Sequence, residues 1–391
     1  MSRMSTPHVT ATLRSWPIGL LLVAVACGPA QPQATTGSSP SQTPSSSPPP
    51  AALLFAALET NAAAAQFQWN TVAIAGLDGV ARAKTTFAPM PIPYTGCAGA
   101  VLPPSAHVAA GKVYFADGQG TIRSLDPQGD VTKVATIPFT GNQQMLSFAV
   151  SPDGSQLLAA VFSLPAQASS GDACAGGAAF VPGPFTLDVY SAQAGGAGQR
   201  LYHDVLPTSS SQPVPNVMAF EGWDRVGPEA TYPTQWATQG GGAHPDGTMV
   251  WVDSSTGKIS RQVGDPQSCL VWDVAPSGDY VCTTSQVGGI SVRRPDGSEV
   301  WGFAAPANGP YENPRLSPLE GRVAAGGSDS AVVTSAGKHV ALGLYPLGWL
   351  DDSTVVGGGY TADFTYVNLA SPSTVSDIGF KGLFVGAIQH S

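Results

Sequence analysis

The chain has 391 residues, a formal net charge of −9 and only 17 Lys and Arg residues. It has no basic stripe that would neutralise phosphates, so nucleic acid is not expected as a partner. Its 46 Gly and 35 Pro argue against long helices as the main architecture. The composition therefore favours an all-β fold.

The N-terminal segment resembles a secretory signal. Arg3 and Arg14 flank a polar segment that precedes the apolar run WPIGLLLVAVA. This run is too short to anchor a chain across a bilayer comfortably. The sequence AVAC, which ends at Cys27, resembles the lipobox of bacterial lipoproteins, and this resemblance implies a lipid on Cys27. Ala24 stands where that motif usually has Leu, and Ala24-Val25-Ala26 would also suit ordinary signal cleavage.

These features predict a signal peptide over 1–26, a lipid-anchored tether over 27–66 and a folded domain over 67–391. Residues 28–50 are rich in Ser, Thr and Pro and have nothing to bury, so they predict a disordered, extended leash. Residues 51–66 fit either a short docked helix or a continuation of the leash. The protein is accordingly expected on the outer face of a bacterial cell membrane, outside the cytoplasm.

Cysteine usage agrees with an oxidising compartment. Of five cysteines, removal of Cys27 for the lipid leaves an even number, which suits disulfides. We predict the pairs Cys97–Cys174, in two Gly-rich loops, and Cys269–Cys282, on neighbouring strands. Free buried thiols are the alternative.

A hairpin with a tight turn recurs along the domain. In SFAVSPDGSQLLAAVF (147–162), two apolar runs flank Ser-Pro-Asp-Gly, in which Pro152 and Gly154 suit the turn. The Val, Phe and Leu residues on both sides favour strands. Related hairpins begin at Ala106, Leu270, Asn313 and Gly348, and each is followed by a second hairpin. The turn glycines repeat at about 43 residues, and short strands at such a period are typical of a β-propeller.

Six four-stranded blades fit into residues 97–379. A seventh forms if the strand pair in 70–87 joins a strand in 381–389, and this junction would close the ring and remove exposed edges. The sequence therefore predicts a seven-bladed β-propeller, with six or eight blades as alternatives. A pair of β-sandwiches is a further alternative, but it would not need the regular spacing.

The Pro-Asp-Gly hairpins resemble those of the TolB-like and WD-repeat-like propellers of bacterial envelope proteins. VDSSTGK (252–258) resembles the strand ends of quinoprotein-type propellers. The resemblance covers residues 67–390 and implies that ligand sites lie at one mouth of a central channel.

Three expected inner strands carry a tryptophan close to a carboxylate. Such a ring would suit a sugar or a cationic peptide, because an aromatic face with a nearby acceptor gives both contact area and orientation. The alternative is that the tryptophans pack between blades and the aspartates shape turns. The candidate residues are Trp223, Asp224, Trp272, Asp273, Trp349 and Asp351.

The stretch from Ser209 to His244 departs most from blade regularity. Long loops on a rigid scaffold are where binding residues concentrate, so this stretch is our first choice for a ligand or partner surface. Besides Trp223 and Asp224 it supplies Glu221, Arg225, Trp236 and His244. A loop without a binding role is the alternative.

The sequence offers little support for catalysis. Its histidines lack metal-ligand spacing, and it has no Gly-x-Ser-x-Gly elbow, phosphate loop or Cys-x-x-Cys pair. No cofactor is expected, although a structural calcium ion near Asp351 and Asp352 is a weaker possibility. We therefore expect a monomeric binding or scaffolding module for a protein or carbohydrate ligand. The alternative is a propeller enzyme, a lactonase-like hydrolase or a quinone-dependent dehydrogenase, that acts on a small carbohydrate.

Overall fold

The computed structural model describes most of the chain from residue 53 onward, which belongs to one compact unit, Pro50–Ser391. Every regular element in the described part is a β-strand. The described residues contain no apolar helix of membrane-spanning length. The described ranges are 53–59, 69–91, 94–95, 98–99, 106–141, 143–164, 184–206, 218–233, 245–265, 267–284, 288–305, 309–327, 329–358 and 363–389.

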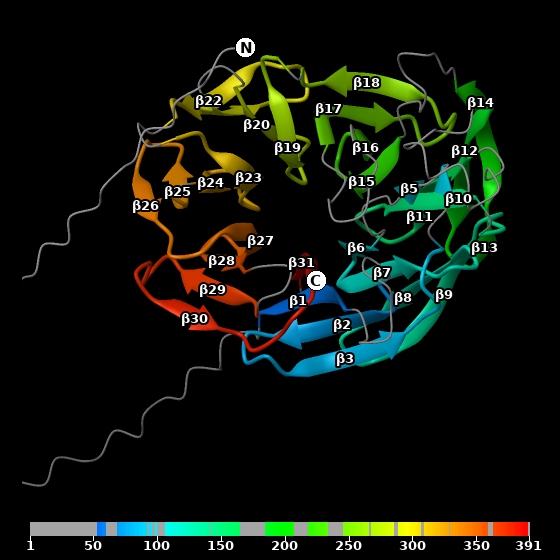
Figure 1. Cartoon of the computed structure of the whole chain (residues 1–391), viewed down its shortest axis with the longest axis horizontal. Helices are drawn as coiled ribbons and strands as arrows, with labels where there is room; N and C mark the ends of the chain where they lie inside the picture. Colours follow the sequence, from blue (N-terminus) through cyan, green and yellow to red (C-terminus); the bar gives the residue numbers. More distant parts are fainter. Residues whose placement is uncertain are drawn as a thin grey trace, which may run out of the picture. The chain divides into compact units, whose positions relative to one another are not determined.

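Within those ranges the strands form seven antiparallel blades around a central axis (Figure 1). The expected seven-bladed all-β propeller is thereby confirmed. In blade order, the innermost strands are β31 (Leu383–Ile388), β6 (Ala106–Ala109), β10 (Gln144–Val150), β15 (Ala219–Trp223), β19 (Leu270–Val274), β23 (Glu312–Leu316) and β27 (Pro346–Asp351).

Three further strands follow outward in each blade. The second strands are β1 (Leu54–Glu59), β7 (Lys112–Ala116), β11 (Gln156–Ser163), β16 (Pro228–Pro233), β20 (Tyr280–Thr283), β24 (Arg322–Gly326) and β28 (Thr354–Gly357). The third strands are β2 (Thr71–Gly76), β8 (Thr121–Leu125), β12 (Phe185–Gln193), β17 (Pro245–Val252), β21 (Ile290–Arg293), β25 (Ala331–Thr334) and β29 (Thr365–Asn368). The outer strands are β3 (Ala81–Thr86), β9 (Val131–Thr136), β14 (Gln199–Leu206), β18 (Ile259–Val263), β22 (Glu299–Phe303), β26 (His339–Ala341) and β30 (Val375–Asp377).

Three short strands lie outside this pattern. β13 (Gly196–Ala197) pairs in parallel with β9 of blade 2, and so it links the outer edges of blades 2 and 3. β4 (Tyr94–Thr95) and β5 (Ala98–Gly99) form a two-stranded pair between blades 1 and 2 in the sequence.

Blade 1 joins the two ends of the propeller. β1 pairs with β2 on one side, where Leu54 lies opposite Gly76, and with β31 on the other, where Leu54 lies opposite Ile388. The predicted closure by residues 381–389 is correct, but the predicted tether boundary at residue 66 is wrong. In the segment LFAALE only half of the residues are large and apolar, and none is β-branched, so its composition does not predict a strand. It is nonetheless a nearly fully buried strand, because it is central in its blade.

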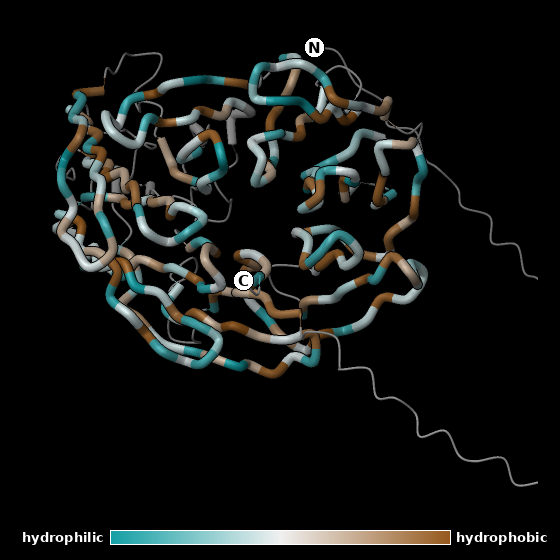
Figure 2. The backbone as a smooth tube through the Cα atoms, turned by 180° about the vertical axis from the view of Figure 1, so that it is seen from behind, coloured by the Kyte–Doolittle hydropathy of each residue, from teal (hydrophilic) through white to brown (hydrophobic). Residues whose placement is uncertain are grey.

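The core lies between neighbouring blades, where side chains of adjacent sheets pack face to face. At the closure, Phe55 of β1 is fully buried, and its ring lies edge-on to Phe364 of blade 7 at 5.6 Å between centroids and to Phe380 at 5.8 Å. Phe384 of β31 completes this aromatic cluster. Figure 2 shows hydrophobic stretches along the strands and hydrophilic residues at many of the connecting turns.

The Ser-Pro-Asp-Gly turn forms as the sequence predicts, between β10 and β11. Gly154 has a φ of 74°, and its N–H donates to the Ser151 carbonyl at 2.8 Å. Asp153 accepts from the Ser151 hydroxyl at 2.6 Å and from the Ser155 N–H at 3.0 Å. These hydrogen bonds lower the pKa of Asp153 to about 2, and the one from the Ser151 hydroxyl has the largest effect. The turn therefore keeps an ionised acceptor at all physiological pH values.

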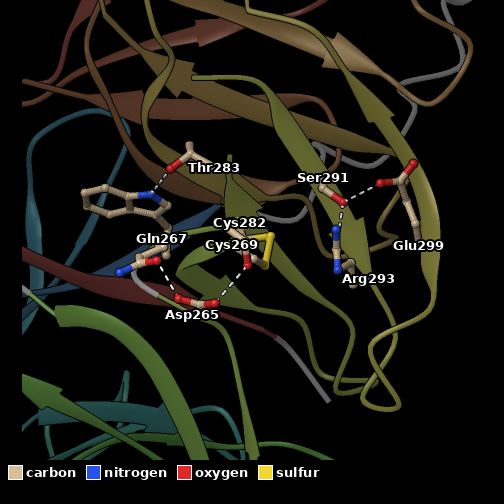
Figure 3. The surroundings of a disulfide bond; sticks show 10 residues. Asp265, Gln267, Cys269, Cys282, Thr283, Ser291, Arg293 and Glu299 are labelled. Carbon is tan, nitrogen blue, oxygen red and sulfur yellow. Dashed lines mark hydrogen bonds between the residues drawn. A yellow bond between two sulfur atoms is a disulfide. The ribbon is translucent and has the colours of Figure 1, made fainter. Parts of the chain in front are cut away.

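A disulfide joins Cys269, just before β19, to Cys282 of β20, with their Cα atoms 5.2 Å apart (Figure 3). The predicted pairing of these two residues is confirmed. Both are buried, and Cys269 also pairs through its backbone with Asp265 at 2.8 Å. The bond therefore fixes the entry of the chain into the innermost strand of blade 5. Cys27, Cys97 and Cys174 lie outside the described residues, and their predicted roles stay predictions.

Ring closure can be tested by shortening the chain. Ending it at Phe380 removes β31 and leaves β1 with an unpaired edge and part of the aromatic cluster exposed. The large apolar residues of β31 account for several kcal/mol of burial, a large part of the about 5–15 kcal/mol that stabilises an ordinary domain. We expect an aggregated or unfolded product, measured by soluble yield and size-exclusion chromatography.

A chain that ends at Gln389 is the matched control, because it loses only two residues beyond the strand. A soluble protein with an unchanged thermal unfolding midpoint after removal of β31 would contradict the importance of this pairing.

Candidate functional site

The two faces of the ring differ in how the strands are connected. First strands run into second strands, and third into fourth, through short turns such as 224–227, 275–279 and 335–338. We call this side the turn face. On the opposite side, the loop face, second strands connect to third strands and outer strands to the next blade. The strand ends that the longest connections join all lie on this face; these connections are 60–70, 87–105, 164–184, 207–218 and 234–244.

Loop length has a functional meaning on a repeat scaffold. The blades are near-copies whose turn-face connections are all short, so the large differences in connection length between blades are concentrated on the loop face. In repeat architectures, insertions that collect on one face commonly form the binding surface. The loop face is therefore the first candidate for recognition of a partner.

The stretch from Ser209 to His244 includes a regular hairpin of blade 4 and is not one continuous loop. Within it lie β15 and β16, which make an ordinary inner hairpin with its turn at 224–227. Glu221 and Trp223 stand on the innermost strand, and Asp224 and Arg225 lie in the turn. This part of the stretch is therefore regular blade structure, in which Gly222 and a bulge interrupt the apolar alternation of the hairpin. The predicted role of the stretch as a ligand or partner surface stays a prediction. Trp236 and His244 lie outside the described residues.

The hydrogen bonds around Asp224 indicate a structural role for its carboxylate. It is buried, and its carboxylate accepts the Trp251 indole N–H at 2.7 Å and the backbone N–H groups of Val226 at 2.6 Å and Gly227 at 2.9 Å. Burial raises the pKa of Asp224, although these hydrogen bonds oppose the shift. Asp224 thus fixes the turn and the fully buried Trp251 between blades 4 and 5.

Glu229 lies beside Asp224 and was not predicted from the sequence. It pairs across the hairpin with Gly222, and a side chain on Gly222 would overlap the Glu229 carboxyl group. Its Oε2 atom is buried without a hydrogen-bond partner in the described part of the chain. Burial raises the pKa of Glu229 well above its ordinary value, and the negative charges of Asp224, Asp273 and Glu221 raise it further. We call these four residues the carboxyl cluster.

Asp273 and Arg315 link blades 5 and 6. The carboxylate of Asp273, on β19, accepts the backbone N–H of Leu316 at 2.8 Å and lies 3.8 Å from the Arg315 guanidinium. Arg315, on β23, also donates to the Trp272 carbonyl at 3.3 Å. Burial raises the pKa of Asp273, and Arg315 opposes this effect. Arg315 is therefore a counter-charge to the carboxyl cluster, and the sequence analysis missed it.

The other predicted residues are held by hydrogen bonds within the chain. Trp349 is 6% exposed and donates its indole N–H to the Arg315 carbonyl at 2.8 Å. Trp272 is half-buried and donates to the Thr283 hydroxyl at 2.9 Å (Figure 3). Asp351 accepts from the N–H and hydroxyl of Ser353 in a turn. Trp349 and Asp351 thus follow the packing and turn alternative.

Bulges interrupt several of the innermost strands next to these side chains. Register shifts occur between Phe220 and Gly222 in β15 and between Val271 and Asp273 in β19, and similar shifts interrupt β23 and β27. A bulge redirects the side chain beside it. The first two shifts skip Glu221, which is exposed, and Trp272, which is half-buried. Their binding role, and that of Asp273, stays a prediction.

The carboxyl cluster is not a metal centre as it stands. Among the described residues, no three His, Cys, Asp or Glu side chains converge closely enough to hold a metal ion. What the cluster can do is hold a proton on Glu229 and attract cations to the exposed Glu221. Glu229 and Arg315 could not be found from motifs, because their neighbours come from other strands and blades.

No protein-family model and no curated protein matches the chain. Solved structures resemble it at low identity. A structure of BamB from Moraxella catarrhalis is 12% identical, with 69% of this chain and 70% of that chain covered and a TM-score of 0.33. The C-terminal WD40 domain of Sif2 is 11% identical, with 74% and 76% covered and a TM-score of 0.39. An oligogalacturonate lyase in complex with manganese is 10% identical, with 81% of both chains covered and a TM-score of 0.45. Likenesses at this level carry no argument about function.

The buried carboxyl of Glu229 predicts a specific pH dependence. Because its pKa is raised in the folded protein, the group is protonated there at pH values where it is ionised in the unfolded chain. The contribution of this protonated carboxyl to the free energy of unfolding is fully present below the unfolded pKa. It is lost as the pH rises through the folded pKa. Between the unfolded and the folded pKa the loss approaches about 1.4 kcal/mol per pH unit, and above the folded pKa it levels off.

The variant Glu229→Gln should therefore gain stability relative to the wild type as the pH rises from about 5 to 8. Urea unfolding across this range measures the difference. Glu312→Gln, at an exposed glutamate of β23, is the control and should show no such trend. Parallel pH profiles for the wild type and Glu229→Gln would show that Glu229 is not protonated in the fold.

Proposed function

We propose that the protein is a non-catalytic binding scaffold, a monomer anchored by lipid on Cys27 at the outer face of a bacterial membrane. In this proposal the propeller recognises a partner protein or an extended ligand through its loop face. The observation that carries it is the distribution of connections, since every one of the longest segments joins strands on one face of the ring.

Two other features support a binding role. The turns on the opposite face are short and fixed by their own hydrogen bonds, as at Asp153, Asp253 and Asp296, so that face offers a regular and rigid base. The chain also carries a net charge of −9, which favours basic partners and disfavours nucleic acids. A rigid ring with variable loops is suited to recognition because the scaffold restricts the loop ends.

The proposed anchor rests on the sequence around Cys27 and predicts a simple fractionation result. In bacterial cells, the wild-type chain should be in the membrane fraction, and its N-terminal peptide should carry a lipid on Cys27 by mass spectrometry. Cys27→Ser should release the protein or leave it unprocessed. Ala24→Leu, which brings the segment closer to the usual lipobox, is the control and should stay lipidated. A mature wild-type chain with an unmodified Cys27 would show ordinary signal cleavage instead.

The proposed binding face can be tested with two matched alanines. Ala304 lies at the end of β22 on the loop face, Ala336 lies in the turn between β25 and β26, and both are exposed. A photoreactive benzoylphenylalanine at position 304 should give ultraviolet-dependent adducts to a partner in intact cells. The same group at position 336 should give none. Adducts from position 336 alone, or equal adducts from both, would contradict recognition through the loop face.

A further inference from the structure

Blade 6 carries a groove of about 650 Å³ that opens on the loop face. Its walls come from the connection into β23, from the segment between β24 and β25, and from the chain that leaves β26. This volume is within the range of small-molecule binding sites. The side chains that the argument uses are Tyr311, Asp329, Ser330, His339, Leu342 and Tyr345.

Tyr345 forms a fixed aromatic surface in this groove. Its side chain is 37% exposed although it lies in a folded connection. One part of the ring lies directly over Gly326 of β24, where any side chain would overlap it. The phenol oxygen accepts a hydrogen bond from the Asn313 side-chain amide. The ring is therefore held from one side and from its tip, while the remainder faces solvent.

His339 is positioned by two aromatic neighbours. The Tyr311 hydroxyl lies 3.2 Å from Nδ1 of His339, and Phe303 lies edge-on to the imidazole at 5.9 Å between centroids. Tyr311 is 3% exposed, and the direction of its hydrogen bond with Nδ1 follows the tautomer of His339. The other ring nitrogen, Nε2, can therefore serve a ligand as donor or as acceptor, and it belongs to an exposed side chain.

The polar groups of the groove suit an uncharged ligand with hydroxyl groups. Asp329 offers an acceptor, and His339 and Ser330 can each donate or accept. The described residues that line the groove include no Lys or Arg, so a phosphate or carboxylate ligand would lack a counter-charge among them. The floor includes Leu342, which is buried and apolar. A flat apolar surface beside donors and acceptors matches the two sides of a sugar ring.

We propose that this groove binds a neutral pyranose unit of an oligosaccharide, stacked on Tyr345 and hydrogen-bonded to His339 and Asp329. The inference rests on the proposed binding role of the loop face and names a ligand class for one part of it. Directional hydrogen bonds to sugar hydroxyls would give selectivity, because a ligand without them leaves the polar groups unpaired.

The test uses the purified full chain in a detergent without a sugar headgroup. Cellopentaose, xylopentaose, mannopentaose, maltopentaose and chitopentaose are titrated by calorimetry, and saturation-transfer NMR identifies the ring protons in contact. We expect at least one to bind with a Kd of about 1 mM or tighter. Tyr345→Ala should weaken the binding of that sugar about tenfold, equivalent to about 1.4 kcal/mol, because it removes the surface on which the sugar ring stacks.

Further variants separate loss of the site from loss of the fold. Gly326→Ala keeps the tyrosine but displaces its ring, so it should weaken binding as Tyr345→Ala does. Tyr345→Phe keeps the ring and should bind within about twofold of the wild type. Tyr202→Ala, at a half-buried tyrosine of blade 3, is the matched control and should bind normally. All variants are compared by thermal unfolding.

The proposal is overturned if none of the five sugars binds, or if binding is unchanged in both Tyr345→Ala and Gly326→Ala. The proposal would also be overturned if a lysine-rich peptide bound more tightly than all five sugars and lost this binding in Tyr345→Ala and Gly326→Ala. These results are independent of the cross-linking from position 304. A failed sugar titration with adducts at 304 would remove the ligand assignment and leave the loop face as a partner surface.

Discussion

The pairing of β1 with β31 is the constraint on which the rest of the structure depends. Without this pairing, β1 and β31 would each keep an unpaired strand edge, and in an open row the two end blades would each have one apolar surface without a neighbour. Strands from the two ends of the domain instead share blade 1, and Phe55 is enclosed by Phe364, Phe380 and Phe384 of the neighbouring segments. Every blade therefore has two neighbours, and the innermost strands of all seven are fixed around one axis.

Much of this architecture could be predicted from local chemistry. Ser151, Asp153 and Gly154 form a turn whose geometry is set within a few residues, and copies of such turns at a constant period imply stacked hairpins. The strand Leu54–Glu59 could not be recognised in the same way. Its alanines carry no strand preference, and its extended conformation comes from partners that lie about 20 and more than 300 residues away in the sequence.

The candidate site shows the same division. The sequence identified Cys269 and Cys282 as partners because they stand on neighbouring strands, and it placed Trp272 and Asp273 on an inner strand. It could not show that Glu229 lies close enough to three other carboxylates for their charges to raise its pKa, since that proximity depends on the register of one hairpin and the packing of the next blade. Nor could it show that Gly326 leaves room for the ring of Tyr345, which lies in the connection between β26 and β27. Relations between blades need the folded ring.

The antiparallel order within blade 1 gives the ring a direction. Leu54 lies opposite Ile388, and both stand at the end of their strands where innermost strands run into the turn face. The chain thus enters and leaves the propeller on that one side. An attachment that reaches the propeller through Leu54 therefore meets it on the turn face. A reporter fused after Gln389 would begin on that same face, whereas one inserted between Leu164 and Pro184 would begin at strand ends on the loop face.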